Sequence, residues 1–242
     1  MSFFGKVKLC LWSSWAPLAR RMHITVPAMS LYMFGTHPIY FTDSTDVGTF
    51  LEVFLHEEYS IAVSILPRTI LDLGANSGYT SIYFAHMFPH AKIIAVEADP
   101  KNIQKIKKNA ESFGGQIVIE PSAVAAKSGS LDFYLNFKTS ISGSAIRRDG
   151  TAEKITVPAL SLADLEKKYG HFDIVKFDIE GGEWSAIDVS FLSSSPSIFI
   201  GEYHEDIIGK SIDDFLVRFG NYSAAKKKIA NNRFLVTLVS KK

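Results

Sequence analysis

The chain of 242 residues contains a single cysteine, Cys10. One cysteine cannot form a disulfide within the chain or supply a cysteine-based metal site, and a reducing, cytoplasmic location is therefore expected. The charges nearly cancel, with 26 basic and 25 acidic residues, so net charge gives no reason to expect nucleic acid as a partner. Repeats and low-complexity segments are also absent from the sequence. The length of the chain and its apolar content of 47% favour one well-packed domain.

The N-terminal region lacks an apolar run of the roughly 20 residues that span a bilayer. Its apolar residues instead recur at spacings of three and four, with lysines and arginines among them. This pattern over residues 1–25 predicts an amphipathic helix that packs on the domain. A helix lying in a membrane interface is the alternative, and the protein would then be membrane-associated. We expect residues 1–60 to form an extension that covers the substrate, and residues 61–242 to form the main domain.

From Thr69 onward, short apolar runs alternate with segments of helical periodicity and short connections, which is typical of a parallel sheet. A pair of runs on either side of Asn231-Asn232 indicates an antiparallel hairpin. Two alternating runs flank residues 138–150, which we interpret as a mobile loop over the site. The sequence thus predicts an α/β fold with a mostly parallel sheet. The strands are expected at about 39–41, 69–73, 92–97, 116–120, 131–136, 155–158, 172–177, 197–203, 222–229 and 234–239, and the helices at about 47–55, 77–87, 101–112, 162–169 and 212–219.

The connection after the first of these central strands has the spacing Asp-x-Gly-x-Asn-x-Gly. Glycines at such a turn let the backbone approach a ligand at the start of a helix. Two features argue against a dinucleotide ligand. The turn lacks the third glycine of the dinucleotide fingerprint, and the carboxylate of Asp72 would repel a pyrophosphate. A ligand with an ammonium group, S-adenosylmethionine, suits the turn better. The candidate cofactor-binding residues here are Asp72, Gly74, Ala75, Asn76 and Gly78.

The ends of the next two strands continue this site. Glu97 follows Gly78 by nineteen residues, and an acid at that position can accept hydrogen bonds from both ribose hydroxyls. Ala98 follows it directly. Ser122 and Ala123 come after the third strand and would flank an adenine, with Ser122 as a partner for its exocyclic amine.

A second group of polar residues ends two further strands, where ligands gather in open α/β sheets. Asp178 and His204 are expected to reach one cavity from neighbouring strands, and Asp178 would also meet the cofactor. We assign catalytic roles to His204, Asp178 and Glu180, and substrate contacts to Glu183 and Glu202. The spacing of these acids would also permit a hard divalent ion, but ligand number cannot be read from spacing, and we expect no metal.

Three segments, 69–81, 96–102 and 175–183, together resemble the FkbM family of S-adenosylmethionine-dependent methyltransferases. The Asp-x-Glu-Gly-x-Glu run that begins at Asp178 is the more specific of their motifs. Ala98 and Gly182 depart from the residues common in that family, proline and alanine. The resemblance implies a class I methyltransferase fold and O-methylation of a hydroxyl, often on a sugar, glycan or natural-product-type acceptor.

The expected reaction is an in-line attack of a hydroxyl on the sulfonium methyl group, which requires a base to take the hydroxyl proton. His204 is the first candidate, because an unperturbed pKa of about 6.5 suits neutral pH. Asp178 is the second. A non-catalytic scaffold that binds S-adenosylmethionine is the alternative, and an NAD-dependent oxidoreductase is a more distant one. The sequence predicts nothing about oligomeric state.

Overall fold

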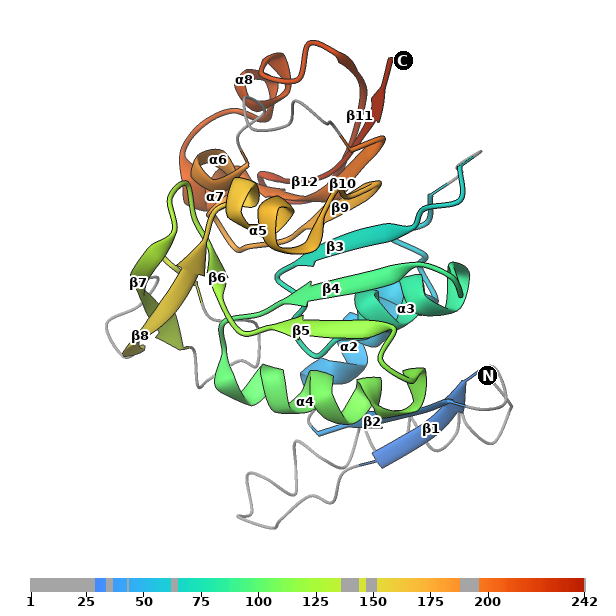
Figure 1. The fold of residues 1–242 in the computed structure, drawn as a ribbon. Coiled ribbons are helices and arrows are strands. Elements are labelled where there is room, and N and C mark those ends of the chain that lie inside the picture. The colour runs from blue at the N-terminus through green and yellow to red at the C-terminus, as the bar shows by residue number, and fades with distance from the viewer. Residues whose placement is uncertain are drawn as a thin grey trace.

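The computed structural model describes residues 29–33, 37–42, 44–61, 65–135, 144–146, 152–187 and 196–241. Their centre is a seven-stranded sheet with the order β11-β12-β10-β9-β3-β4-β5 (Figure 1). Five neighbouring strands are parallel, and the last two form an antiparallel hairpin at one edge. This confirms the fold class. The strands are β3 (Thr69–Leu73), β4 (Lys92–Val96), β5 (Ile117–Glu120), β9 (Ile174–Phe177), β10 (Ile198–His204), β11 (Tyr222–Ala230) and β12 (Arg233–Ser240).

Helices cover both faces of this sheet, because its central strands carry apolar side chains on both sides. On one face, Ile70, Ile93 and Ile174 belong to the hydrophobic core formed with the N-terminal elements and α3. On the other face, Leu71, Ile94 and Val175 belong to a second core formed with the later helices. The helices are α2 (Ser44–Phe54), α3 (Tyr79–Met87), α4 (Pro100–Ala110), α5 (Leu162–Tyr169), α6 (Glu183–Ala186), α7 (Glu205–Ile208) and α8 (Ile212–Val217), with a short 3-10 helix η1 (Glu111–Phe113).

The caps expected from the sequence also form. Asp99 accepts a hydrogen bond from the Lys101 amide at the start of α4, where Pro100 takes the first position. Ser161 caps α5 by accepting from the Asp164 amide. Local sequence thus fixes where these two helices begin.

The described part of the N-terminal region packs against the sheet. Strands β1 (Met29–Met33) and β2 (His37–Phe41) form an antiparallel hairpin. Phe41 meets Phe50 edge to face and also contacts Tyr79 of α3 in the same core. We did not expect β1. The helix expected at 1–25 lies outside the described residues.

A separate three-stranded sheet lies beyond the carboxyl ends of β4 and β5, at the left in Figure 1. It has the order β6-β8-β7, from β6 (Ala123–Val124), β7 (Gly129–Leu135) and β8 (Glu153–Leu160). Strands β7 and β8 were expected, and they enclose a small core of their own around Phe133 and Val157. Most of the expected loop at 138–150 is outside the described residues, except 144–146.

Candidate functional site

The turn after β3 fits tightly against the end of β9. Gly74 has a φ of 72°, and a Cβ added there would lie 1.9 Å from the backbone oxygen of Asp178. The amides of Gly74 and Ala75 both donate to the Val96 carbonyl at 3.0 Å. Only glycine fits this position, and the turn therefore holds the carboxyl ends of three strands together.

Glu97, at the end of β4, has a buried carboxylate that backbone amides hold in place. Its Oε2 accepts from the Asn76 amide at 2.8 Å, and its Oε1 accepts from Ala98 and Asp99 at 2.9 and 2.8 Å. Burial raises the pKa of Glu97 to about 7, although these three hydrogen bonds oppose the rise. The carboxylate is fixed at the rim of a cavity and keeps lone pairs for a ligand's hydroxyls.

This first cavity has an apolar wall and a few polar groups, the usual composition of a cofactor site. The Ser122 hydroxyl is buried and has no hydrogen-bond partner among the described residues. A fixed acid for ribose hydroxyls and an unpaired hydroxyl beside apolar side chains fit an adenosine moiety. The lining residues are Gly74, Val96, Glu97, Ala98, Ser122, Ala123, Val124, Phe133, Ala145, Asp178, Ile179, Glu180 and Gly182.

A second cavity of about 310 Å³ adjoins the first, and the two share Gly74, Asp178 and Glu180. Its walls come from α2, the turn after β3, and the ends of β9 and β10. Acids dominate its polar groups. The lining residues are Thr45, Gly48, Thr49, Glu52, Val53, Glu58, Tyr59, Gly74, Ala75, Asn76, Thr80, Lys176, Asp178, Glu180, Glu202 and Arg233.

Asp72 does not line either cavity. Its carboxylate is fully buried, lies 3.1 Å from the Lys176 ammonium, and accepts a hydrogen bond from Ser81 at 2.6 Å. Burial alone would lower the pKa of Lys176, but the charge of Asp72 and other carboxylates raises it, so the ammonium stays charged. Lys176 is thus the observed ionic partner of Asp72, and the contact that we expected between Asp72 and a cofactor ammonium stays a prediction.

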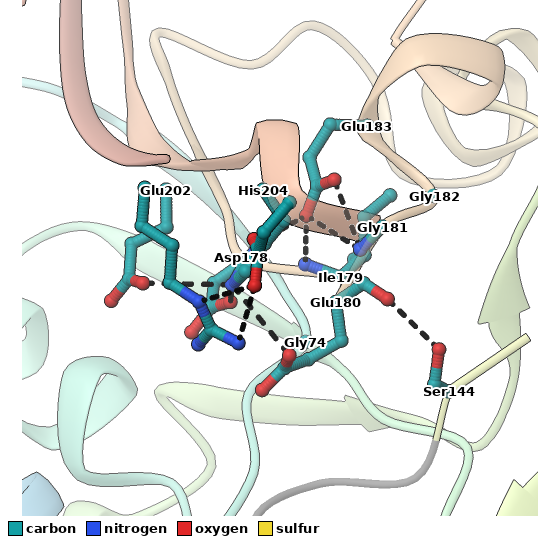
Figure 2. Close-up of polar contacts among 12 residues, drawn as sticks. Gly74, Ser144, Asp178, Ile179, Glu180, Gly181, Gly182, Glu183, Glu202 and His204 are labelled. Carbon is teal, nitrogen blue, oxygen red and sulfur yellow. Dashed lines mark hydrogen bonds and ion pairs between the residues drawn. The ribbon is translucent and has the colours of Figure 1, made fainter. Parts of the chain in front are cut away.

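His204, at the end of β10, is enclosed by carboxylates (Figure 2). Its Nδ1 lies 2.9 Å from Glu183 Oε1. Its Nε2 faces carboxylate oxygens of Asp178, Glu180 and Glu202 at 3.8, 3.6 and 3.6 Å. Four acids expected near one another are thus brought together, around a ring that is itself 1% exposed.

These surroundings change the expected protonation states. Burial alone would lower the pKa of His204, but the hydrogen bond to Glu183 and the nearby negative charges raise it to about 9. This raised pKa removes our reason for choosing His204 as the base, which was an unperturbed pKa near 6.5, and the identity of the base stays a prediction. Burial raises the pKa of Asp178 to about 6 against the lowering effect of Lys176. Burial and the charge of Asp178 raise the pKa of Glu202 to about 9.

Glu183 has a different position from the one expected. It is fully buried, lines neither cavity, and also accepts hydrogen bonds from the amides of Ile179 and Gly181 at 3.2 and 3.0 Å. It therefore fixes the His204 ring and the loop after β9, and its buried position gives no support to the expected substrate contact. Gly78 also lines neither cavity.

Two of the site residues have left-handed backbone conformations that cost energy for residues other than glycine. Asn76 has a φ of 50° and Glu180 a φ of 53°. The buried Ser144 hydroxyl donates to the Glu180 carbonyl at 2.8 Å and helps to hold this conformation. Strained backbone of this kind concentrates at functional sites.

Sequence reasoning missed several residues of the second cavity, among them Lys176, Glu58 and Tyr59. A lysine inside the apolar strand 174–177 was the available signal, since a buried charge requires a partner. Tyr59 donates to Glu202 at 3.4 Å, and the Lys176 ammonium lies 5.5 Å from its ring centre. No comparable pattern marks residues 58 and 59 in the sequence.

Comparison with known proteins identifies the relatives of this chain. Residues 72–223 match the model of the methyltransferase FkbM domain. The chain is also similar to the O-methyltransferase imqG of Aspergillus flavus, with 39% identity over 56 residues, or 23% of each protein. The match thus covers less than a quarter of that relative's length.

Solved methyltransferase structures resemble the chain more weakly. One is an O-methyltransferase from Bacillus cereus in complex with SAH, which shares 12% sequence identity with this chain. The match covers 99% of this chain and 92% of that protein, with a TM-score of 0.48. The O-methyltransferase TomG from Streptomyces achromogenes in complex with SAM shares 11% identity, covers 95% and 89%, and has a TM-score of 0.46. Across the described residues, no helix is long and apolar enough to cross a membrane.

Proposed function

The chain belongs to the FkbM family of methyltransferases, and on that basis we propose that it methylates a hydroxyl oxygen of a small-molecule acceptor, such as a sugar, a glycan or a natural-product-type compound. S-adenosylmethionine is the cofactor. The observation that carries the proposal is the junction of the two cavities at Gly74, Asp178 and Glu180. A cofactor in one cavity and an acceptor in the other would meet there.

The first cavity would hold the adenosine part of the cofactor. The fixed Glu97 carboxylate would accept hydrogen bonds from the ribose hydroxyls, and Ser122 would bind the adenine amine. Asn76 and Ala75, which line the second cavity, would contact the methionine part. The bound cofactor supplies an activated methyl group, and the protein mainly contributes alignment, which is worth up to about 7–11 kcal/mol in well-oriented systems.

The acceptor side needs a group that takes the hydroxyl proton. Asp178 is the best-suited carboxylate, since it lines both cavities and has a free Oδ1 without a hydrogen-bond donor among the described residues. Glu180 and Glu202 would orient the acceptor by accepting hydrogen bonds from its other hydroxyls. A positive charge held at His204 would limit the repulsion among these acids. Acidic walls disfavour phosphorylated or carboxylated acceptors and favour neutral, hydroxyl-rich ones.

The N-terminal extension would complete the acceptor cavity. Helix α2 supplies Thr45, Thr49 and Glu52 to its wall, and the segment after it supplies Tyr59. This supports the expectation that residues 1–60 cover the substrate of the domain at 61–242.

The proposal is tested by labelled-methyl transfer. The full chain is incubated with S-adenosylmethionine carrying a carbon-13 methyl group and with small-molecule extracts of the source cells. We expect a product with a labelled methoxy carbon in its NMR spectrum, and at least a tenfold lower rate for Asp178→Asn, because a positioned base contributes 10²–10⁴-fold. A labelled N-methyl or S-methyl product would overturn O-methylation.

A further inference from the structure

The contacts of His204 raise a chemical problem that the cofactor site does not explain. The Glu183 carboxylate accepts hydrogen bonds from the amides of Ile179 and Gly181, so the Nδ1 of His204, 2.9 Å away, is assigned as a further donor to it. In a neutral ring, Nε2 then presents a lone pair. This atom has no hydrogen-bond partner among the described residues, and carboxylate oxygens of Asp178, Glu180 and Glu202 lie 3.8, 3.6 and 3.6 Å from it (Figure 2). Acceptors that face one another in a buried place require a positive charge between them.

We propose that Nε2 of His204 and the carboxylates of Asp178, Glu180 and Glu202 bind a divalent transition-metal ion. The sequence alone led us to expect none, and the geometry points the other way. The proposal rests on the proposed function for its purpose, since the ion would lie where the two cavities meet and would hold the acceptor hydroxyl beside the methyl group.

The distances favour an ion over a second ring proton. A protonated nitrogen that donates to a carboxylate lies at about 2.7–2.9 Å from it. The nearest carboxylate oxygens are 3.6 Å from Nε2, which is too long for a hydrogen bond. Two ligand atoms bound to one ion at about 2.0–2.2 Å, with a tetrahedral angle between them, are separated by roughly 3.3–3.6 Å. The observed spacing is close to that separation.

The surroundings of the ring match those of metal-bound histidines. Such a histidine donates its other N–H to a carboxylate, which fixes the ring and raises its basicity. Glu183 has this position, and the amides of Ile179 and Gly181 hold its own carboxylate. Ligand atoms of Asp178, Glu183 and His204 also lie within 4.8 Å of one another. Because these donors already engage its carboxylate, we assign Glu183 as a positioning residue, and Nε2 of His204 with the other three carboxylates as the ligands.

The donor set indicates the kind of ion. One imidazole nitrogen with carboxylate oxygens suits Mn²⁺, Fe²⁺ or Zn²⁺, whereas Mg²⁺ and Ca²⁺ prefer oxygen ligands alone. Asp178, Glu180 and Glu202 line the second cavity, so an ion has a route to the site from solvent.

Two measurements on the full chain, freed of metal by a chelator, test the proposal. Calorimetry with Zn²⁺ should show one ion bound per chain, with at least tenfold weaker binding for His204→Ala and about 10–100-fold weaker binding for Glu183→Gln. The matched control is Glu52→Gln, which removes an acid of the same cavity that is not among the proposed ligands, and it should bind as the parent does. Equal binding by the parent and His204→Ala would overturn the proposal, as would no binding by the parent.

The second measurement needs no variant. Pulsed electron paramagnetic resonance of bound Mn²⁺ should show coupling to an imidazole nitrogen, and its absence would overturn the proposal even if His204→Ala does not fold. Calorimetry with S-adenosylhomocysteine keeps the two proposals separate. Metal binding without S-adenosylhomocysteine binding would leave the site standing and remove the methyltransferase assignment, and the reverse result would remove only the metal.

Discussion

The backbone oxygen of Asp178 lies 1.9 Å from the point that a Cβ on Gly74 would occupy. The turn after β3 and the loop after β9 are in contact at this point, and both cavities are bounded by it. Substitution here should therefore disturb the cofactor site directly.

Gly74→Ala should lower the affinity for S-adenosylhomocysteine at least tenfold and also lower the melting temperature, since a side chain forces the two loops apart and φ stays at 72°. The control is Gly220→Ala, where an added Cβ meets nothing within 4 Å. It should leave both quantities unchanged. Unchanged affinity in Gly74→Ala would show that the turn has room that the structure does not indicate.

Cofactor affinity should depend on pH through Glu97. Its pKa is raised from 4.5 to about 7 by burial, so the carboxyl group becomes charged only as pH rises through 7. Hydrogen bonds from ribose hydroxyls are stronger to the charged form. Affinity for S-adenosylhomocysteine should thus increase between pH 6 and pH 8, and Glu97→Gln should remove this increase.

The raised pKa of Glu97 should make the stability of the ligand-free protein fall as pH rises, whereas cofactor affinity increases. A carboxyl group whose pKa is raised by folding contributes stability below its unfolded value of 4.5, and that contribution is lost as pH rises toward 7. Denaturation without ligand should show this loss in the parent and not in Glu97→Gln. If stability depends on pH in the same way in both proteins, the raised pKa assigned to Glu97 is contradicted.

The Asp72–Lys176 pair should be a major source of stability for the sheet, because both groups are buried. Lys176→Met leaves a buried carboxylate without its partner and should cost about 3–5 kcal/mol in the free energy of unfolding, measured with urea. The double variant with Asp72→Leu should recover part of that loss. Lys154→Ala, which breaks the exposed pair with Asp132, should change stability little. A small effect of Lys176→Met would contradict the charged pair.

Ser122→Ala should lower the affinity for the cofactor product without lowering the stability of the fold. No hydrogen bond within the described residues is lost, so stability should not fall. Affinity for S-adenosylhomocysteine should decrease about fivefold, the equivalent of one hydrogen bond of about 1 kcal/mol. Ser161→Ala should lower stability and leave the affinity unchanged. It removes the cap of α5 at a cost of about 1 kcal/mol, and the residue lies outside both cavities. Reduced stability in Ser122→Ala would indicate a structural role.

The sequence predicted the parallel strands and the hairpin, and it placed Glu97 at the end of a strand, because each follows from local patterns of apolar and turn residues. It could not show which strands are neighbours. Asp72 and Lys176 are direct partners in the pairing of β3 with β9, and only that register reveals that Asp72 is already neutralised.

The surroundings of His204 were hidden for the same reason. Glu202 and His204 are on β10, while Asp178, Glu180 and Glu183 follow β9, and the parallel pairing of these strands brings all five residues together. The unperturbed pKa of about 6.5 that we used for His204 does not include the effect of these surrounding carboxylates. The strand β1 was missed because residues 29–33 lack a clear alternation of apolar and polar residues.

The most direct test of the account compares the affinity of two acid variants for S-adenosylhomocysteine by calorimetry at pH 8. Glu97 is assigned to the cofactor cavity, and Glu52 lines only the acceptor side. The parent should bind one molecule per chain, Glu97→Gln should bind at least tenfold more weakly, and Glu52→Gln should match the parent. Binding by Glu97→Gln that equals the parent's would contradict the assigned cofactor site.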